Sequence, residues 1–180
     1  MLKRPLLIAG LIMGLVSLSG CTQPPITYPV APKSVRLAPV QAAKADRVVV
    51  NKGARELMLI RGGKVIRNYP VALGPNPIGH KIMEGDGRTP EGAYVLDWRN
   101  ANSRFHRSIH VSYPDQADRS LAGKLGVSPG GMIMIHGEAS YLRFGGAPRD
   151  WTEGCIAVSN GAMDEIWALV NDGTPIVINP

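Results

Sequence analysis

The sequence is poor in three features that would assign it to common classes of protein. Its 20 Lys and Arg residues are dispersed, so it has no dense basic run of the kind that binds nucleic acid. Its apolar run at residues 6–18 is shorter than the roughly 20 residues that a stable membrane span needs. No segment repeats another. The mild excess of 20 basic over 14 acidic residues is compatible with an anionic wall polymer or a membrane surface as partner.

The N-terminus has the pattern of an export signal. Lys3 and Arg4 precede the apolar run, and Leu18-Ser19-Gly20-Cys21 follows it. Small residues before a cleavage point mark a secretory signal peptide. A cysteine directly after them resembles the bacterial lipobox, whose cysteine is lipid-modified and becomes the first mature residue. We therefore expect residues 1–20 to be a lipoprotein signal peptide and Cys21 to carry lipid; an uncleaved N-terminal anchor is the alternative.

Residues 21–45 are predicted to be a tether that begins at the lipid-modified cysteine. The segment is rich in proline among small and polar residues, a composition that favours extended chain over a packed core. The prolines are Pro24, Pro25, Pro29, Pro32 and Pro39. Residues 46–180 are long enough for one domain with its own core. We expect an exported lipoprotein, anchored in a membrane and facing the periplasm or the cell wall.

Cysteine is scarce, and the two residues present have different predicted roles. If Cys21 carries lipid, Cys155 has no partner in the chain. An exported protein lies where disulfides form, so a lone thiol there is a liability unless it does chemistry. The alternative is an inert buried thiol, which is common for a free cysteine.

After residue 46, short apolar runs alternate with Gly and Pro, which is typical of sandwiches and barrels. Gly62-Gly63 predicts a hairpin turn between two of these runs, because glycine tolerates positive φ. The predicted strands are residues 47–51, 56–60, 64–69, 71–73, 92–98, 108–113, 132–135 and 174–178. The sequence therefore predicts a mostly β fold with a minor α+β character, in a single sandwich-like or barrel-like domain.

One late helix is expected shortly after Cys155. Ser159 or Asn160 can cap its first N–H groups, and Gly173 suits its end. Its apolar residues recur at i, i+3, i+4 and i+7, which places them on one face that can pack on the sheet. These residues are Met163, Ile166, Trp167 and Val170.

The residues around Cys155 favour a nucleophilic thiol. Gly154 has no side chain, so a substrate backbone can approach closely, and backbone N–H groups near Gly154 and Cys155 could face an oxyanion. A thiol attacks only when deprotonated, so its ordinary pKa of about 8.5 must be met by a nearby base or positive charge. Glu153 would disfavour a thiolate. The base must therefore come from another part of the chain.

His136-Gly137 is the best candidate for that base. His136 ends an apolar run and a glycine follows it, so the imidazole can reach a thiol on a neighbouring strand. A Cys–His pair whose imidazole is oriented by a third group is an arrangement of nucleophilic catalysis. The third group, which a backbone carbonyl could supply, is not identifiable from the sequence.

Residues 47–179 resemble the catalytic domain of L,D-transpeptidases, the YkuD domain. The family pattern is matched at His136, Gly137, Thr152, Gly154, Cys155 and Ile156. The stretch of residues 85–94, with Thr89-Pro90 and Gly92-Ala93-Tyr94, resembles the family's Thr-Pro-x-Gly-aromatic signature, and the hairpin that leads to Leu73-Gly74 resembles its entry strands. The resemblance implies a catalytic site formed by Cys155, His136, Gly137 and Gly154.

Two positions depart from the family pattern, in which they line the oxyanion site and hold substrate. Glu153 stands where most members have His, and Ala157 where most have Arg or Asn. Another stretch could supply a basic group. Lys81 and Arg149 are interpreted as surface or satisfied polar residues. The expected substrate-binding residues are Thr152, Glu153, Arg88, His80, His110 and Arg143.

The resemblance implies acyl transfer on peptidoglycan stem peptides. The thiolate would form a thioester with the third residue of the stem, and an amine would then accept the acyl group. The family needs no metal or organic cofactor, and we expect a monomer. If water is the acceptor, the same site is an L,D-carboxypeptidase or endopeptidase.

Two readings from other classes are kept as alternatives. A zinc hydrolase would use ligands such as His106 and His110, whose i, i+4 spacing suits a helix, but the segment reads as strand. A non-catalytic peptidoglycan-binding lipoprotein would explain the changes at Glu153 and Ala157. A retained thiol in an oxidising compartment argues against that reading.

Overall fold

The computed structural model describes residues 43–139 and 150–180. The predicted signal peptide, most of the tether with Cys21, and both Arg143 and Arg149 lie outside the described residues. No helix in the described part of the chain is long and apolar enough to cross a membrane.

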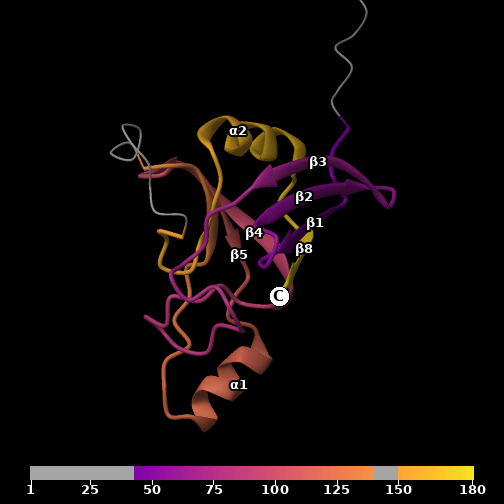
Figure 1. The fold of residues 1–180 in the computed structure, drawn as a ribbon. Helices are drawn as coiled ribbons and strands as arrows, with labels where there is room; N and C mark the ends of the chain where they lie inside the picture. Colours follow the sequence, from indigo (N-terminus) through magenta and orange to yellow (C-terminus); the bar gives the residue numbers. More distant parts are fainter. Residues whose placement is uncertain (1–42, 140–149) are drawn as a thin grey trace, which may run out of the picture. The chain divides into compact units, whose positions relative to one another are not determined.

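The domain is built on one curled sheet of eight strands in the order β3-β2-β1-β8-β4-β5-β6-β7 (Figure 1). Neighbouring strands are antiparallel except for β1 with β8 and β6 with β7. The strands are β1 (Arg47–Asn51), β2 (Glu56–Arg61), β3 (Lys64–Pro70), β4 (Gly92–Ser103), β5 (His106–Val111), β6 (Met134–His136), β7 (Ile156–Ala157) and β8 (Thr174–Asn179). The predicted mostly β fold class is confirmed.

Alternation along the strands decides which side chains form the core. In β1, Val48 and Val50 are buried, and β2 places Leu57 and Leu59 beside them. Successive side chains of a strand point to opposite faces, so one face of each strand supplies the core. Each such aliphatic side chain contributes about 1.5–3 kcal/mol when fully buried.

The predicted hairpin and late helix are both present. Gly62 and Gly63 have φ values of 54° and 74°, as a two-residue turn between β2 and β3 requires. Helix α2 (Asn160–Leu169) is capped by Ser159, whose side chain accepts from the N–H of Ala162. It packs across the concave side of the sheet, because it contacts β5 and β6 while Glu165 accepts from Tyr69 of β3.

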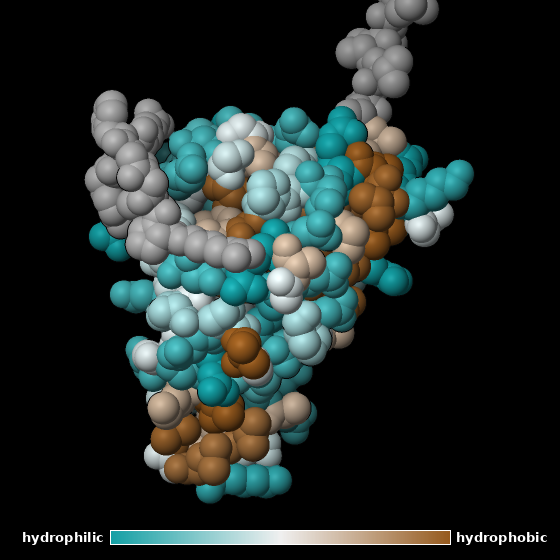
Figure 2. Space-filling view, viewed as in Figure 1, coloured by the Kyte–Doolittle hydropathy of each residue, from teal (hydrophilic) through white to brown (hydrophobic). Residues whose placement is uncertain are grey.

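A second helix, α1 (Gln116–Lys124), is not predicted by the periodicity of the sequence. Only Asp118 and Ala122 are buried on it, so it has no apolar stripe to detect. A capping box between Asp115 and Asp118 starts the helix. Leu121 and Leu125 remain exposed, and the surface around α1 is apolar at the lower end of the view in Figure 2.

The predicted strand at residues 71–73 is reduced to one isolated bridge, between Ala72 and Ala157. That bridge lies beside β7, the last strand of the sheet order. The chain around Ala72 therefore borders the segment that leads to Cys155, where it forms contacts described below.

Candidate active site

Strands β6 and β7 bring His136 and Cys155 together. The two strands are parallel, with Ile135 opposite Ile156 and His136 opposite Ala157. Cys155 directly precedes β7, so its side chain lies on the same face as those of Ala157 and His136, because side chains alternate along a strand. His136 and Cys155 accordingly line one cavity of about 700 Å³.

The imidazole of His136 is held in one tautomer. Its Nδ1 lies 2.6 Å from the carbonyl oxygen of Gly137. A carbonyl only accepts, so Nδ1 carries the proton and Nε2 keeps its lone pair in the neutral ring. Burial lowers the pKa of His136, and the Gly137 carbonyl opposes this only in part. The ring is therefore neutral near pH 7 and able to accept a proton at Nε2.

Glycine is required at position 137 by its neighbours. A Cβ there would come within 2.4 Å of Oδ1 of Asn160 and within 3.0 Å of the carbonyl oxygen of Phe105. The N–H of Gly137 also donates to Phe105 and Arg107. These contacts fix the carbonyl that orients His136.

Two aromatic side chains flank the imidazole. The ring of Phe105 lies 4.7 Å from that of His136, and the ring of Trp151 lies 5.6 Å from it in an edge-on arrangement. Neither residue can be singled out from the sequence, because neither belongs to a recognisable motif. Their apolar faces account for the burial that keeps His136 neutral.

The thiol of Cys155 is protonated at rest. Burial raises the pKa of Cys155, the N–H of Met134 and the charge of Lys81 lower it, and the charge of Glu153 raises it. Sγ donates to the carbonyl oxygen of Met132 at 3.5 Å. A neutral thiol thus faces a neutral imidazole, and attack requires transfer of its proton.

Two loops hold the segment before Cys155 in place. Thr89 Oγ1 donates to the carbonyl oxygen of Gly154 at 2.9 Å, and Thr152 N donates to the carbonyl oxygen of Leu73 at 2.9 Å. Gly154 has a φ of 119°, and a Cβ there would approach the Arg88 carbonyl oxygen to 2.5 Å. Glycine is therefore required at this position by both conformation and space.

An ion pair completes this support. Arg55 donates to both carboxylate oxygens of Asp150, at 3.0 and 2.8 Å, and Asp150 also accepts from the N–H of Leu73 at 3.1 Å. Both charged side chains are largely buried. The β1–β2 turn, which contains Arg55, is thereby joined to the segment that ends in the nucleophile candidate.

A second cavity of about 700 Å³ adjoins the first and shares with it Trp151, Thr152, Glu153 and Cys155. Its far walls are the loops around Glu84 and Gly130. Cys155 therefore borders both cavities.

Comparison with known proteins agrees with this geometry. The family model of the YkuD L,D-transpeptidase catalytic domain matches residues 45–178. The chain belongs to the L,D-transpeptidase catalytic-domain family. A search of curated proteins gives no significant match.

Solved structures of bacterial proteins share the fold. The helical cell shape determining protein Pgp2 from Campylobacter jejuni is 26% identical with a TM-score of 0.60, over 76% of this chain and 48% of Pgp2. Bd1075 from Bdellovibrio bacteriovorus is 23% identical with a TM-score of 0.53, over 79% of this chain and 50% of Bd1075. The chain therefore spans about half the length of these proteins.

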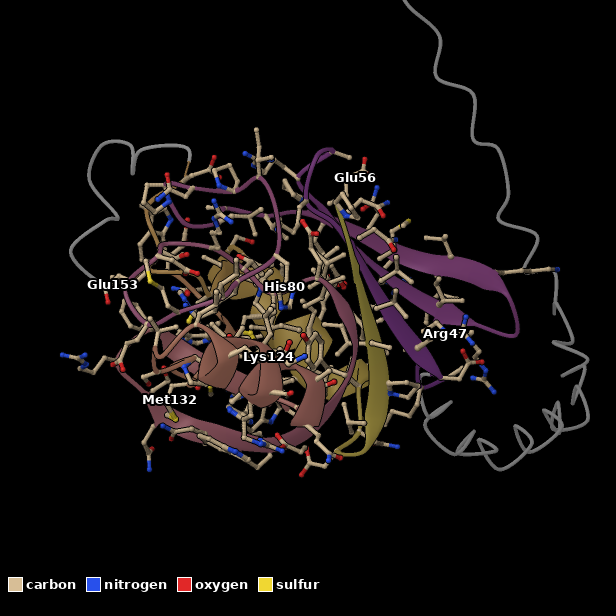
Figure 3. All side chains as sticks on the ribbon, turned by 90° about the horizontal axis from the view of Figure 1, so that it is seen from below. Arg47, Glu56, His80, Lys124, Met132 and Glu153 are labelled. Atoms are coloured by element: carbon tan, nitrogen blue, oxygen red, sulfur yellow. The ribbon has the colours of Figure 1, made fainter. Side chains whose placement is uncertain are left out.

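Of the substrate-binding residues predicted for this L,D-transpeptidase domain, two lie at the cavities. Thr152 is buried, and its Oγ1 donates to the carbonyl oxygen of Cys155 and accepts from the N–H of Gly154, so it shapes the backbone. Glu153 is exposed at the edge of the domain, on the same side as Met132 (Figure 3). Of these two residues, only Glu153 carries a charge that a ligand in the cavities can contact.

Three other predicted residues, His80, Arg88 and His110, do not line either cavity. His80 is partly buried, and its Nδ1 accepts from the N–H of Glu91 while Nε2 donates to Asp118 (Figure 3). Arg88 points to the carbonyl oxygen of His80, and His110 donates to Asp97 and stacks on Trp98. Arg143 lies outside the described residues.

The described residues contain no group of three or more His, Cys, Asp or Glu that could hold a metal ion. His106 and His110 both lie on β5, so the helical spacing considered for zinc does not exist. His106 is instead paired with Asp164 of α2.

Proposed function

We propose that this protein is a peptidoglycan L,D-transpeptidase in which Cys155 attacks a stem peptide and transfers it to an amine. The observation that carries the proposal is the pairing of Cys155 and His136 on adjacent strands at one cavity, in a domain of this family. The imidazole tautomer supports the role of His136 as base, because Nε2 is the nitrogen left to accept.

The chemistry balances with these groups alone. Sγ bonds to the carbonyl carbon of the third stem residue while its proton passes to Nε2 of His136. His136 then protonates the departing amine of the terminal D-amino acid, and a thioester remains. An acceptor amine attacks the thioester, gives up its proton through His136, and releases Cys155. Such positioned proton transfer contributes on the order of 100- to 10,000-fold.

Backbone donors near Cys155 are proposed to stabilise the tetrahedral oxyanion, each contributing on the order of 3 kcal/mol. The N–H of Gly154 already donates to Thr152 Oγ1, at 3.2 Å. Gly154 therefore serves the site by its conformation and small size.

Export and lipid anchoring at Cys21 are part of the proposal. An enzyme of wall peptides must act outside the cytoplasm, and the N-terminal pattern supplies such a route. The similarity to Pgp2, a protein described as determining helical cell shape, supports a role in wall architecture.

The test compares the full chain carrying Cys21→Ala with the same chain carrying Cys155→Ala as well. Both are incubated with purified tetrapeptide wall fragments, and products are identified by mass spectrometry. We expect a cross-linked dimer that depends on Cys155, with at least a hundredfold loss in the variant. A tripeptide as sole product would make hydrolysis the main reaction. Turnover that survives Cys155→Ala would rule out the nucleophile assignment.

The non-catalytic alternative predicts a different result. A binding lipoprotein would give no product, yet its thiol would still be labelled by a thiol reagent or a carbapenem. Labelling without turnover on any wall fragment would therefore favour binding.

A further inference from the structure

Lys81 is a buried lysine in a wall of the cavity beside Cys155. It is only 3% exposed, and its ammonium donates to the carbonyl oxygen of Met83 at 3.0 Å and to Oδ1 of Asp86 at 2.8 Å. Sequence analysis interprets it as a surface or satisfied polar residue. The structure shows a satisfied cation that is buried at the site, which requires a separate explanation because burying a charge is costly.

The carboxylate of Asp86 is held ionised by many donors. Besides Lys81, it accepts the backbone N–H groups of Ile82, Met83 and Arg88. Burial raises the pKa of Asp86, but these donors together outweigh burial and lower it. The backbone N–H groups of the loop therefore stabilise the negative charge of Asp86 together with Lys81.

One N–H group of the Lys81 ammonium is left after its two hydrogen bonds are counted. An ammonium has three N–H groups, and Met83 and Asp86 take two of them. Among the residues that the structure describes, no third acceptor is found for it. Lys81 borders the cavity, so the third N–H is available to charge that forms there.

The other ionisable groups of the two cavities leave this role to Lys81. Glu84, Glu153 and the cation Arg104 are exposed, so water screens their charges more than that of a buried group. His136 is neutral, and Asp150 is paired with Arg55. Among the residues that the structure describes, the charged and titratable lining of the two cavities is Lys81, Glu84, Arg104, His136, Asp150 and Glu153, together with the thiol of Cys155.

We propose that the ammonium of Lys81 stabilises the negative charge that develops on Cys155 and on the attacked carbonyl. The inference rests on the proposed function, since it takes Cys155 as the nucleophile. In the family pattern, most members have Arg or Asn at the position of Ala157. In this chain, Lys81 would supply a positive charge that Ala157 cannot. Lys81 is 74 residues away from Cys155 in the sequence, so no local motif connects the two.

The charge of Lys81 acts when the proton leaves the thiol. Transfer of that proton to Nε2 of His136 creates a thiolate in a buried place, which burial and Glu153 both oppose. Lys81 offsets this cost, and it continues to do so when the charge moves from sulfur to the oxygen of the tetrahedral intermediate. No proton is gained or lost by Lys81 in either step.

The experiment measures alkylation of Cys155 by iodoacetamide across pH 6–10 in the full chain carrying Cys21→Ala, where Cys155 is the remaining cysteine. Iodoacetamide is uncharged, so its rate reports the thiolate and not attraction of the reagent. Lys81→Met should raise the pKa of the thiol and slow alkylation at pH 8 about three- to tenfold, as expected for loss of a nearby charge. Lys81→Arg should restore most of the rate.

Lys52→Met is the matched control. Lys52 is also a buried lysine bound to the same loop, through the carbonyl oxygens of Gly79 and Thr89, but it lines neither cavity. The Lys52→Met variant should show the same dependence of alkylation rate on pH as the parent, even if its melting temperature is lower. Lys81→Gln, which is neutral and can still donate to Met83 or Asp86, serves if Lys81→Met does not fold.

Each outcome decides the inference. A folded Lys81→Met or Lys81→Gln protein with the alkylation profile of the parent would overturn it, and so would a shift of equal size in Lys52→Met. Because alkylation needs no wall substrate, the result is independent of the transpeptidase assay. Turnover retained in Cys155→Ala would instead defeat the proposed function itself.

Discussion

At the scale of single residues, the site depends on how one imidazole is held. The sequence predicts His136 and Cys155 as partners, because a Cys–His pair is recognisable from motif and strand position. It cannot predict that the Gly137 carbonyl accepts from Nδ1, because that contact depends on the turn after β6. Nor can it predict Phe105 and Trp151, which lie against the ring from separate loops.

The pKa directions of His136 and Cys155 predict the pH dependence of the reaction. The pKa of His136 lies below its ordinary value of 6.5, so kcat/KM should fall only when pH drops below that value. The pKa of Cys155 lies above the ordinary value of a cysteine thiol, so the thiol stays protonated through neutral pH. Alkylation by iodoacetamide should therefore rise steeply only above pH 9.

A stable thiolate–imidazolium pair would give the opposite profile. Alkylation would then be fast and level from about pH 5 to 8, because the sulfur would already be ionised. The Cys21→Ala, Cys155→Ala chain, which has no cysteine, provides the background for labelling.

At the scale of elements, Cys155, the proposed nucleophile, lies before a strand of two residues, which cannot be stable alone. Strand β7 is held by β6 on one side and by the bridge to Ala72 on the other. Period-two patterning is enough to predict the long strands around Val48 and Leu57. It misses α1, which a capping box starts without an apolar stripe, and it predicts a strand at residues 71–73 where the structure has a single bridge.

The Arg55–Asp150 ion pair is predicted to hold the segment that contains Cys155. Arg55→Ala should lower the free energy of unfolding by about 1–3 kcal/mol, because a largely buried carboxylate loses its charged donors. It should also lower kcat/KM on the order of 10- to 100-fold, since small displacements of a reacting group are costly. Chemical denaturation and steady-state kinetics measure the two effects.

Arg67→Ala is the control for this prediction. Arg67 pairs with Glu165 at 3.0 Å on the surface, where both side chains are about half exposed (52% and 53%). Such a pair contributes about 0–1 kcal/mol, so stability and activity should change little. Equal losses of stability and of kcat/KM in the two variants would contradict the prediction, because Arg55 would then contribute no more to the site than a surface arginine.

At the scale of the whole molecule, this chain carries the catalytic domain and matches 48% of the length of Pgp2. The family model begins at residue 45, close to the predicted start of the domain at residue 46. The residues before it contain the lipobox pattern and the proline-rich tether, and almost all of them lie outside the described residues. Composition and motif are therefore the evidence for export.

Cys21→Ala should release the protein from membranes. A lipid chain on Cys21 would contribute about 0.8 kcal/mol for each buried CH₂ group, and the described residues offer no helix that could span a bilayer instead. Membrane fractions from cells that express each chain, probed by immunoblotting, measure the effect; Cys155→Ala serves as a control that removes the other cysteine and should remain membrane-bound. If Cys21→Ala stays with the membrane after residues 1–20 have been removed, a feature other than a lipid on Cys21 holds the protein there and the lipobox interpretation is wrong.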